Sequence, residues 1–275
     1  MIILVVITLL PLFLGFIYSI LNTIGIAGIT RNGFTMQYWV EVFDSGELVS
    51  SLIYSCYISC MIIIISCTAS LAITLTFRSK ILRGPSSYLF YIPLSLPFIV
   101  AAFISFQLLS KSGLFSRILY SMNFIHDSGA FPDLINDPNS FGIIFTHVII
   151  ATAFFSILFS TVFKNEKLHE LGEAARTLGA SKWALLKKVW IPGLLQKTFP
   201  SILLYGIFMM GSYEIPLLLG TQQHQMISVL IAQKFQKYNL QDIPIAYIFS
   251  AIYTVMITGI LFFLFKKNKL IHEIQ

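Results

Sequence analysis

The sequence predicts an all-α membrane protein with six transmembrane helices, and three observations support this fold class. Of its 275 residues, 56% are hydrophobic and only 11% are charged, and the mean hydropathy is +0.82. Soluble domains carry about 25% charged residues. Six separate runs of roughly 20 apolar residues are each long enough to cross a hydrocarbon core about 30 Å thick. The basic residues fall mainly on one set of loops, as the positive-inside rule requires of a multi-pass protein.

The six apolar runs define the predicted spans. The first run has no positively charged start and no small-residue cleavage site, so we interpret it as a retained span and not as a secretory signal. Glu214 and Pro216 interrupt the fifth run, which makes it the least regular one. The predicted spans are Ile2–Leu21, Leu52–Phe77, Tyr88–Leu109, Phe141–Phe163, Ser201–Leu219 and Ile245–Phe265.

Charge distribution predicts the orientation. Thirteen of the 18 lysines and arginines fall on one set of loops and tails, among them Arg78, Lys80 and Arg83. The positive-inside rule places that set in the cytoplasm, together with both termini. We expect one transmembrane domain, residues 1–275, with a cytoplasmic segment at residues 164–193.

This cytoplasmic segment is the most informative part of the chain. Its core, Glu173–Pro192, reads EAARTLGASKWALLKKVWIP. Acidic residues lie early in the whole segment and basic residues late, an order that complements the helix dipole; these are Glu166, Glu170 and Glu173, then Lys182, Lys187 and Lys188. Gly in a helix interior costs about 1 kcal/mol relative to Ala. The pattern therefore predicts a short helix that ends near Gly179, followed by an amphipathic stretch around Trp183–Trp190. Leu178, Trp183 and Leu186 would form its apolar face, and Pro192 would end the segment before the fifth span.

By pattern alone, an ordinary surface helix between two spans explains this segment as well as a docking element does. The segment resembles the EAA loop of ABC importer permeases, in which Glu-Ala-Ala, three residues, Gly, nine residues and Ile-x-Leu-Pro follow in order. Val for Ile and Ile for Leu are conservative departures. The residues in register are Glu173, Ala174, Ala175, Gly179, Val189, Ile191 and Pro192. The six-span layout likewise resembles the type I importer permease fold, including the stretch Phe34–Tyr38 after the first span.

The resemblance implies a membrane-spanning permease subunit of an ATP-driven importer in a bacterial inner membrane. The loop would then be a coupling helix that docks in a groove of a cytoplasmic ATPase. Glu173 would make polar contacts there, Ala174 and Ala175 would keep the contact surface small, and Gly179 would permit close approach. The implied partners are an ATPase dimer, a second permease subunit of the same or a related chain, a periplasmic or lipid-anchored substrate-binding protein, and membrane lipid, with no nucleic acid.

The missing motifs restrict the chemistry of this chain. It contains no G-x-x-x-x-G-K-[ST] phosphate loop, so ATP and Mg²⁺ are expected on the partner, with no cofactor or metal here. It has no G-x-S-x-G nucleophile motif and no paired carboxylates within the spans, which argues against an intramembrane enzyme. An ion-coupled secondary carrier is the alternative from another class, although such carriers often show internal repeats, and none is visible.

Glu214 is the only carboxylate inside a predicted span. A charge at the bilayer centre costs at least about 2.5–3.5 kcal/mol on insertion scales, so it should face protein or a wet cavity. Tyr213 precedes it, and Pro216 favours a kink. Lining of a substrate pathway and pairing with a neighbouring helix both fit. The run Gly211–Gly220 resembles permeases of the polyamine and iron(III) branch, which also includes phosphonate and thiamine importers, and we expect a polyamine-like substrate.

Two further features of the spans remain open. Pro93 and Pro97 lie four residues apart on one face of the third span and predict a bend, either static or lining a gate. His147 lies in the fourth span, where a hydrogen bond to a neighbouring helix is expected more than a proton relay.

Overall fold

The computed structural model describes residues 2–28, 33–77 and 87–272, and every regular element in these ranges is helical. Arg31, Arg78, Lys80 and Arg83, which contribute to the predicted charge asymmetry, lie outside the described residues. The chain divides into two compact units, Met1–Ser55 with Gln225–Gln275 and Cys56–His224. Helix α3 (Glu47–Phe77) runs from the first unit into the second. The prediction of a single permease domain stays a prediction.

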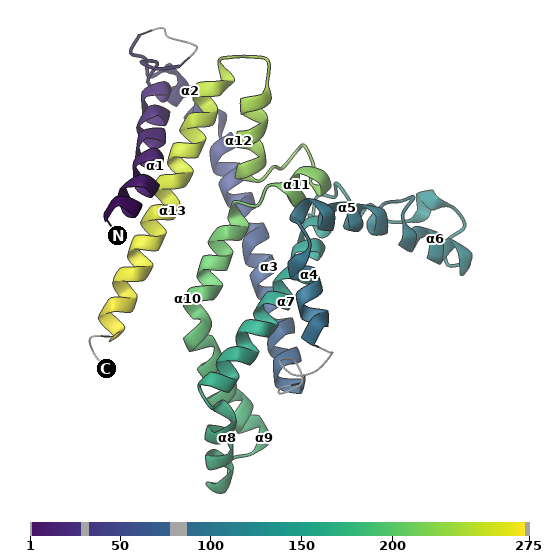
Figure 1. The fold of residues 1–275 in the computed structure, drawn as a ribbon. Helices are drawn as coiled ribbons and strands as arrows, with labels where there is room; N and C mark the ends of the chain where they lie inside the picture. Colours follow the sequence, from purple (N-terminus) through teal and green to yellow (C-terminus); the bar gives the residue numbers. More distant parts are fainter. Residues whose placement is uncertain (1, 29–32, 78–86, 273–275) are drawn as a thin grey trace. The chain divides into compact units, whose positions relative to one another are not determined.

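The first unit is built around α13 (Asp242–His272), which packs against α1 (Ile2–Thr23), α2 (Gln37–Ser45) and α12 (Ile227–Gln236), as Figure 1 shows. One buried cluster holds these helices and the start of α3 together. Its members are Tyr38, Val42, Leu48, Ile227, Ile245, Ile248 and Phe249. The buried Lys234 Nζ lies 2.7 Å from Glu47 Oε2 and 5.4 Å from the centre of the Phe249 ring.

The second unit contains the C-terminal part of α3 and most of the remaining helices. In chain order these are α4 (Tyr88–Ser95), α5 (Phe98–Leu109), α6 (Leu114–Ser121), α7 (Phe141–Asn165), α8 (Leu168–Thr177), α9 (Lys182–Leu185), α10 (Ile191–Met210) and α11 (Glu214–Leu219). The 3₁₀ turn η3 (Ser128–Ala130) and the π-helical turn η4 (Leu186–Trp190) complete it.

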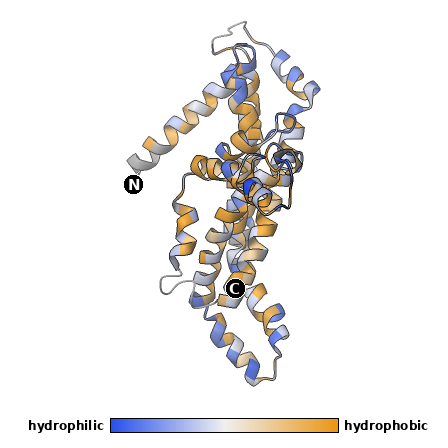
Figure 2. Cartoon of the chain, turned by 90° about the vertical axis from the view of Figure 1, so that its right-hand side faces the viewer, coloured by the Kyte–Doolittle hydropathy of each residue, from blue (hydrophilic) through white to orange (hydrophobic). Residues whose placement is uncertain are grey.

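Hydroxyl side chains join the long helices of the second unit. Ser59 Oγ donates to the carbonyl of Gly206 at 2.7 Å, and Ser70 Oγ donates to the carbonyl of Thr152 at 2.9 Å. These bonds link α3 to α10 and to α7. Membrane helices associate through small residues and interhelical hydrogen bonds, because burial against lipid offers little hydrophobic gain. In Figure 2 the long helices are mostly apolar, whereas hydrophilic residues appear in the α8–α9 segment at the lower end of the view.

Four stretches in the described residues are long and apolar enough to cross a membrane: Glu47–Phe77, Phe98–Ser121, Phe141–Asn165 and Asp242–Leu264. A shorter apolar helix covers Leu9–Thr23. The all-α membrane fold is therefore confirmed, and the predicted second, fourth and sixth spans each coincide with a long helix. The count of six spans and the cytoplasmic position of both termini stay predictions.

Two predicted spans need correction, because each is broken into two helices. The run Tyr88–Leu109 divides into α4 and α5 at Leu96, whose backbone is extended (φ −80°, ψ 129°). Pro97 follows, and proline disfavours the helical region for the residue before it. Figure 1 shows α4 and α5 pointing in different directions, so the predicted bend is a complete break.

The run Ser201–Leu219 is the second correction. Helix α10 already begins at Ile191 and ends at Met210, and Gly211–Tyr213 separate it from α11. Pro216 is the third residue of α11. Since backbone N–H groups in a first helical turn lack an intrahelical partner, proline is tolerated there, and the break lies before Pro216.

Candidate functional site

The turn at Gly179 ends α8 in a defined way. Gly179 has φ +86°, its N–H donates to the carbonyl of Arg176 at 2.9 Å, and the N–H of Ala180 donates to the carbonyl of Ala175 at 3.0 Å. These two bonds form a Schellman motif, whose left-handed position favours glycine. A Cβ at Gly179 would meet nothing within 4 Å, so it is the backbone conformation that calls for glycine here. The predicted short helix that ends near Gly179 is therefore present as α8.

A second helical stretch begins directly after the turn. The Ser181 side chain accepts a hydrogen bond from the N–H of Ala184 at 3.3 Å and caps α9. The backbone then stays in the right-handed helical region through η4 into α10. Pro192 lies in the first turn of α10 and does not end the segment as predicted. The π-helical turn just before it changes the local hydrogen bonding, which lets a residue without an N–H be accommodated.

The inner side of this segment is closely packed. Leu168, Gly172, Leu185 and Trp190 are buried. Trp190 Nε1 donates to the carbonyl of Leu168 at 2.9 Å, and a Cβ at Gly172 would lie 2.7 Å from the same Nε1. The base of α8 is therefore held directly against η4. This contact was not predicted from the sequence, in which the only signal is that Gly172 follows Leu168 by four residues and so lies on the same helix face.

The outer side of the segment is exposed. Glu173, Ala174 and Gly179 are open to solvent, and Leu178 and Trp183, on either side of the turn, are 89% and 79% exposed. Ala175 is half-buried. Leu186 is also half-buried and lines a groove next to α3. The exposed apolar face therefore contains Leu178 and Trp183 as predicted, but not Leu186. Leu178 and Trp183 are the two most exposed large apolar side chains of the segment.

Ion pairs engage the carboxylates of the segment. Glu166 lies 3.3 Å from Lys197, Glu170 lies 3.7 Å from Lys167, and Glu173 lies 3.6 Å from His169. All three contacts are exposed to solvent, where an ion pair contributes at most about 1 kcal/mol, and the contact of Glu173 with His169 is an ion pair only when the imidazole is protonated. Within the described part of the chain, several cations nearby form no ion pair; these are Arg176, Lys182, Lys187 and Lys188. The segment therefore presents positive charge.

The two helix breaks of the second unit meet at His147 on α7. His147 Nδ1 lies 2.9 Å from the carbonyl of Ile143, and Nε2 lies 2.8 Å from Ser212 Oγ. Since a carbonyl only accepts, Nδ1 donates, and in the neutral ring Nε2 accepts from the Ser212 hydroxyl. The ring of Phe98, at the start of α5, lies 6.3 Å from His147. The predicted hydrogen bond of His147 was to a neighbouring helix, whereas its side-chain partner Ser212 lies in the non-helical stretch between α10 and α11.

The candidate pathway residues lie next to this junction. Tyr213 and Glu214 are half-buried, Pro216 is buried, and α11 packs against α5 and α7. Glu214 forms no ion pair with any residue that the structure describes. As the first residue of α11, its negative charge is favoured by the helix dipole. Both interpretations of Glu214, lining of a pathway and pairing with a neighbouring helix, stay predictions.

The second unit thus combines long apolar helices with an exposed, positively charged segment between α7 and α10. The family model for the binding-protein-dependent transport system inner membrane component matches residues 62–268, and the chain belongs to this family. The predicted resemblance to ABC importer permeases is confirmed. The family is a membrane transport component and not an enzyme.

Individual relatives agree with this assignment. The probable ABC transporter permease protein y4fN of Sinorhizobium fredii is 31% identical over 91 residues, which are 33% of this chain and 16% of that relative. The match thus spans about a sixth of the relative's length. A bacterial ABC transporter involved in the import of the acidic polysaccharide alginate has a chain that superimposes with a TM-score of 0.63, at 17% identity over 93% of both chains.

A second structure of the bacterial alginate ABC transporter, in complex with an alginate pentasaccharide-bound periplasmic protein, also gives a TM-score of 0.63 at 17% identity. It covers 94% of this chain and 92% of that chain. At this identity the likeness shows a shared fold.

Proposed function

We propose that this chain is the membrane-spanning permease subunit of an ATP-driven importer in a bacterial inner membrane, where it forms half of the substrate pathway. One observation carries the proposal: the segment around Gly179 exposes Leu178 and Trp183 almost fully, while its base is fixed by Trp190 and Leu168. A rigid base with an apolar tip suits transmission of force from a cytoplasmic partner. Family membership supports the same role.

In this proposal the exposed segment is the coupling helix. Glu173 makes polar contacts in the ATPase groove, Ala174 and Ala175 keep the contact surface small, and Gly179 permits close approach. Pro192 lies in the first turn of the helix that leads back into the membrane. ATP and Mg²⁺ bind to the ATPase dimer, so no cofactor is needed on this chain. A second permease chain, identical or related, completes the pathway, and a periplasmic or lipid-anchored protein delivers the substrate.

Recovery of the ATPase with tagged chain in mild detergent tests the coupling role. Trp183→Ala is expected to weaken ATPase recovery about 30-fold, because tryptophans central to interfaces contribute about 2 kcal/mol or more. The melting temperature should stay unchanged, since Trp183 is 79% exposed in the free chain. Tyr238→Ala is the matched control, because Tyr238 is an exposed aromatic residue on a loop predicted to lie on the opposite side of the membrane. Equal ATPase recovery in both variants would contradict the coupling role.

We assign a polyamine-like cation as the substrate. The half-buried Glu214 beside the α10–α11 break offers a negative charge, and the run Gly211–Gly220 resembles polyamine permeases. Iron(III), phosphonate or thiamine are the alternatives within the same branch. The ligand carried by a co-purified binding protein distinguishes them, and uptake driven by an ion gradient without ATP would indicate a secondary carrier.

Uptake of a labelled polyamine by the reconstituted complex tests the role of Glu214. Glu214→Gln keeps the side-chain shape and removes the charge, so uptake should fall at least about tenfold, the equivalent of one lost charge interaction of about 1.4 kcal/mol. Assembly with the ATPase should be unaffected. The exposed carboxylate Glu41 on α2 provides the control variant Glu41→Gln. If Glu214→Gln transports like the control, Glu214 has no part in the pathway.

A further inference from the structure

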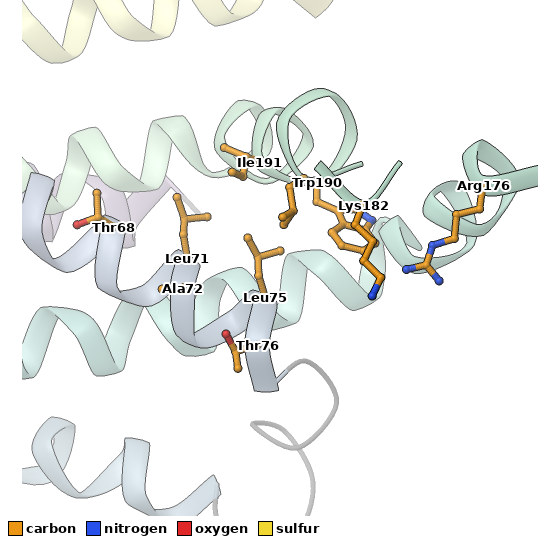
Figure 3. A pocket seen from close by; sticks show the side chains of 10 residues that line it. Thr68, Leu71, Ala72, Leu75, Thr76, Arg176, Lys182, Trp190 and Ile191 are labelled. Carbon is orange, nitrogen blue, oxygen red and sulfur yellow. The ribbon is translucent and has the colours of Figure 1, made fainter. Parts of the chain in front are cut away.

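A groove of about 650 Å³ lies between the end of α3 and the segment at residues 164–193, called the coupling segment from here on. Figure 3 shows the residues that line it. All of its lining residues belong to the second unit. The wall formed by α3 follows the spacing i, i+3, i+4, i+7, i+8, which is one face of a helix. These residues are Thr68, Leu71, Ala72, Leu75 and Thr76. Over eight residues of helix this face is about 12 Å long.

The opposite wall changes character along its length. Leu186, Trp190 and Ile191 continue the apolar lining. Arg176 and Lys182 follow, one from each side of the Gly179 turn, and in Figure 3 their charged ends lie at the end of the groove away from Thr68. The groove is therefore apolar along the membrane helix and cationic at the cytoplasmic segment.

The two cations have no acidic partner in the part of the chain that the structure describes. Two carboxylates of the segment, Glu166 and Glu170, pair with Lys197 and Lys167 instead, and the third, Glu173, lies 3.6 Å from His169. Positive charge at the end of an apolar groove is complementary to an anion that carries a hydrophobic tail. Basic pockets between membrane helices on the cytoplasmic side bind anionic lipid headgroups for this reason.

We propose that this groove binds an anionic phospholipid of the cytoplasmic leaflet, with the phosphate between Arg176 and Lys182 and an acyl chain along α3. The assignment to the cytoplasmic leaflet rests on the orientation in the proposed function. The bound lipid connects the coupling segment to α3 and fixes the angle at which the exposed tip meets its partner.

The position of Arg176 separates this site from the surface proposed for the ATPase. Arg176 follows Gly172 by four residues and Leu168 by eight, so it lies nearer to the packed face of α8 than Glu173 and Ala174 do, although its own side chain is exposed. Glu173 and Ala174 lie on exposed positions of the same helix. A protein partner that contacts the outer face leaves the groove accessible to lipid.

Lipid retention tests the proposal in the complete transporter, assembled with its ATPase in phosphatidylcholine nanodiscs that contain a small fraction of phosphatidylglycerol. Native mass spectrometry then counts the phosphatidylglycerol that stays bound. The variant Arg176→Gln with Lys182→Gln should bind phosphatidylglycerol about 30-fold more weakly, as expected for two membrane-proximal cations. The control variant Lys187→Gln with Lys188→Gln removes the same charge from exposed lysines that do not line the groove, and it should retain the lipid.

Two outcomes overturn the proposal. Equal phosphatidylglycerol retention in the groove variant and the control means that the groove is not the lipid site. Loss of the ATPase from the groove variant with unchanged lipid retention means that its occupant is a protein. Since retention is read without transport, a failed substrate assignment leaves this result intact, and a failed coupling role is recognised separately because the ATPase does not assemble with the unaltered chain.

Tryptophan fluorescence gives a second measurement that also reports on folding. The chain contains three tryptophans, so Trp39→Phe with Trp183→Phe leaves Trp190 as the only indole, and Trp190 lines the groove. Brominated phosphatidylglycerol should quench Trp190 more strongly than brominated phosphatidylcholine. Adding Arg176→Gln and Lys182→Gln should remove this difference. Equal quenching by the two lipids in the chain with its cations intact contradicts an anionic lipid at this site.

Discussion

The contact between Gly172 and Trp190 makes a prediction that runs against helix propensity. Replacing glycine by alanine inside a helix is normally stabilising by about 1 kcal/mol. At Gly172 the added Cβ would lie 2.7 Å from Trp190 Nε1, 2.9 Å from Cζ2 and 3.0 Å from Cε2. All three atoms belong to one rigid ring, so the ring as a whole must move. We therefore expect Gly172→Ala to destabilise the second unit.

Three contributions determine the size of the effect. Overpacking of a buried site costs about 1–3 kcal/mol. Moving the indole breaks its bond from Nε1 to the carbonyl of Leu168, and a buried polar group left unpaired costs about 1–3 kcal/mol. Subtracting the helix propensity gain of about 1 kcal/mol leaves a net loss of roughly 3 kcal/mol. For a unit of 150–250 residues, this lowers the apparent melting temperature by about 6–12 °C.

Thermal unfolding of the purified chain in detergent measures this loss. Gly259→Ala in α13 is the matched control, because a Cβ there would meet nothing within 4 Å. Its melting temperature should stay the same or rise. A double-mutant cycle with Trp190→Leu separates the pair from its surroundings, since the penalty of Gly172→Ala should vanish once the ring is gone. If Gly172→Ala raises the melting temperature as Gly259→Ala does, the close packing of α8 against η4 is wrong.

Two further substitutions test the turn and the buried ion pair. Gly179→Ala places a side chain at φ +86° and should cost about 1–2 kcal/mol, which is measured as reduced recovery of the ATPase. Asparagine tolerates the left-handed region better, so Gly179→Asn should keep most of the ATPase recovery. Equal recovery in both variants would contradict the backbone argument. Glu47→Gln leaves the buried Lys234 ammonium without its carboxylate and should lower the free energy of unfolding by about 2–3 kcal/mol. Lys234→Met leaves the half-exposed Glu47 carboxylate, which water solvates, and should cost about 1 kcal/mol or less. Melting temperatures in the reverse order would contradict this account.

Local signals in the sequence were sufficient for part of this structure. The long apolar runs of α3, α7 and α13 are recognisable from length and composition, because a span of about 20 apolar residues has few other uses. The end of α8 near Gly179 was predictable for a similar reason, since one residue in the left-handed region closes the helix with two backbone bonds. Neither feature depends on a distant part of the chain.

Contacts between distant residues explain what the sequence did not predict. Trp190 meets Leu168 across 22 positions, and His147 meets Ser212 across 65. The break at Gly211–Tyr213 was placed too late, at Pro216, because proline signals a kink only where its missing N–H removes a helical bond. In the first turn of α11 no such bond exists.

The position of α10 joins the two candidate sites into one mechanical argument. From Lys182 the helical backbone continues through η4 to Met210, with no break between the exposed tip and the junction at Ser212. At 1.5 Å per residue the 20 residues of α10 alone extend about 30 Å, which is the thickness of the hydrocarbon core. In the proposed function, we expect a displacement of the coupling segment to move the rod as a unit, because Trp190 and Leu185 are buried at its base and Trp190 is bonded to Leu168. The far end of the rod is the non-helical stretch beside Glu214, which can change its backbone angles without disturbing a packed helix. We therefore expect closure of the ATPase to reach the substrate pathway through this helix, which ends in a hinge next to a half-buried carboxylate.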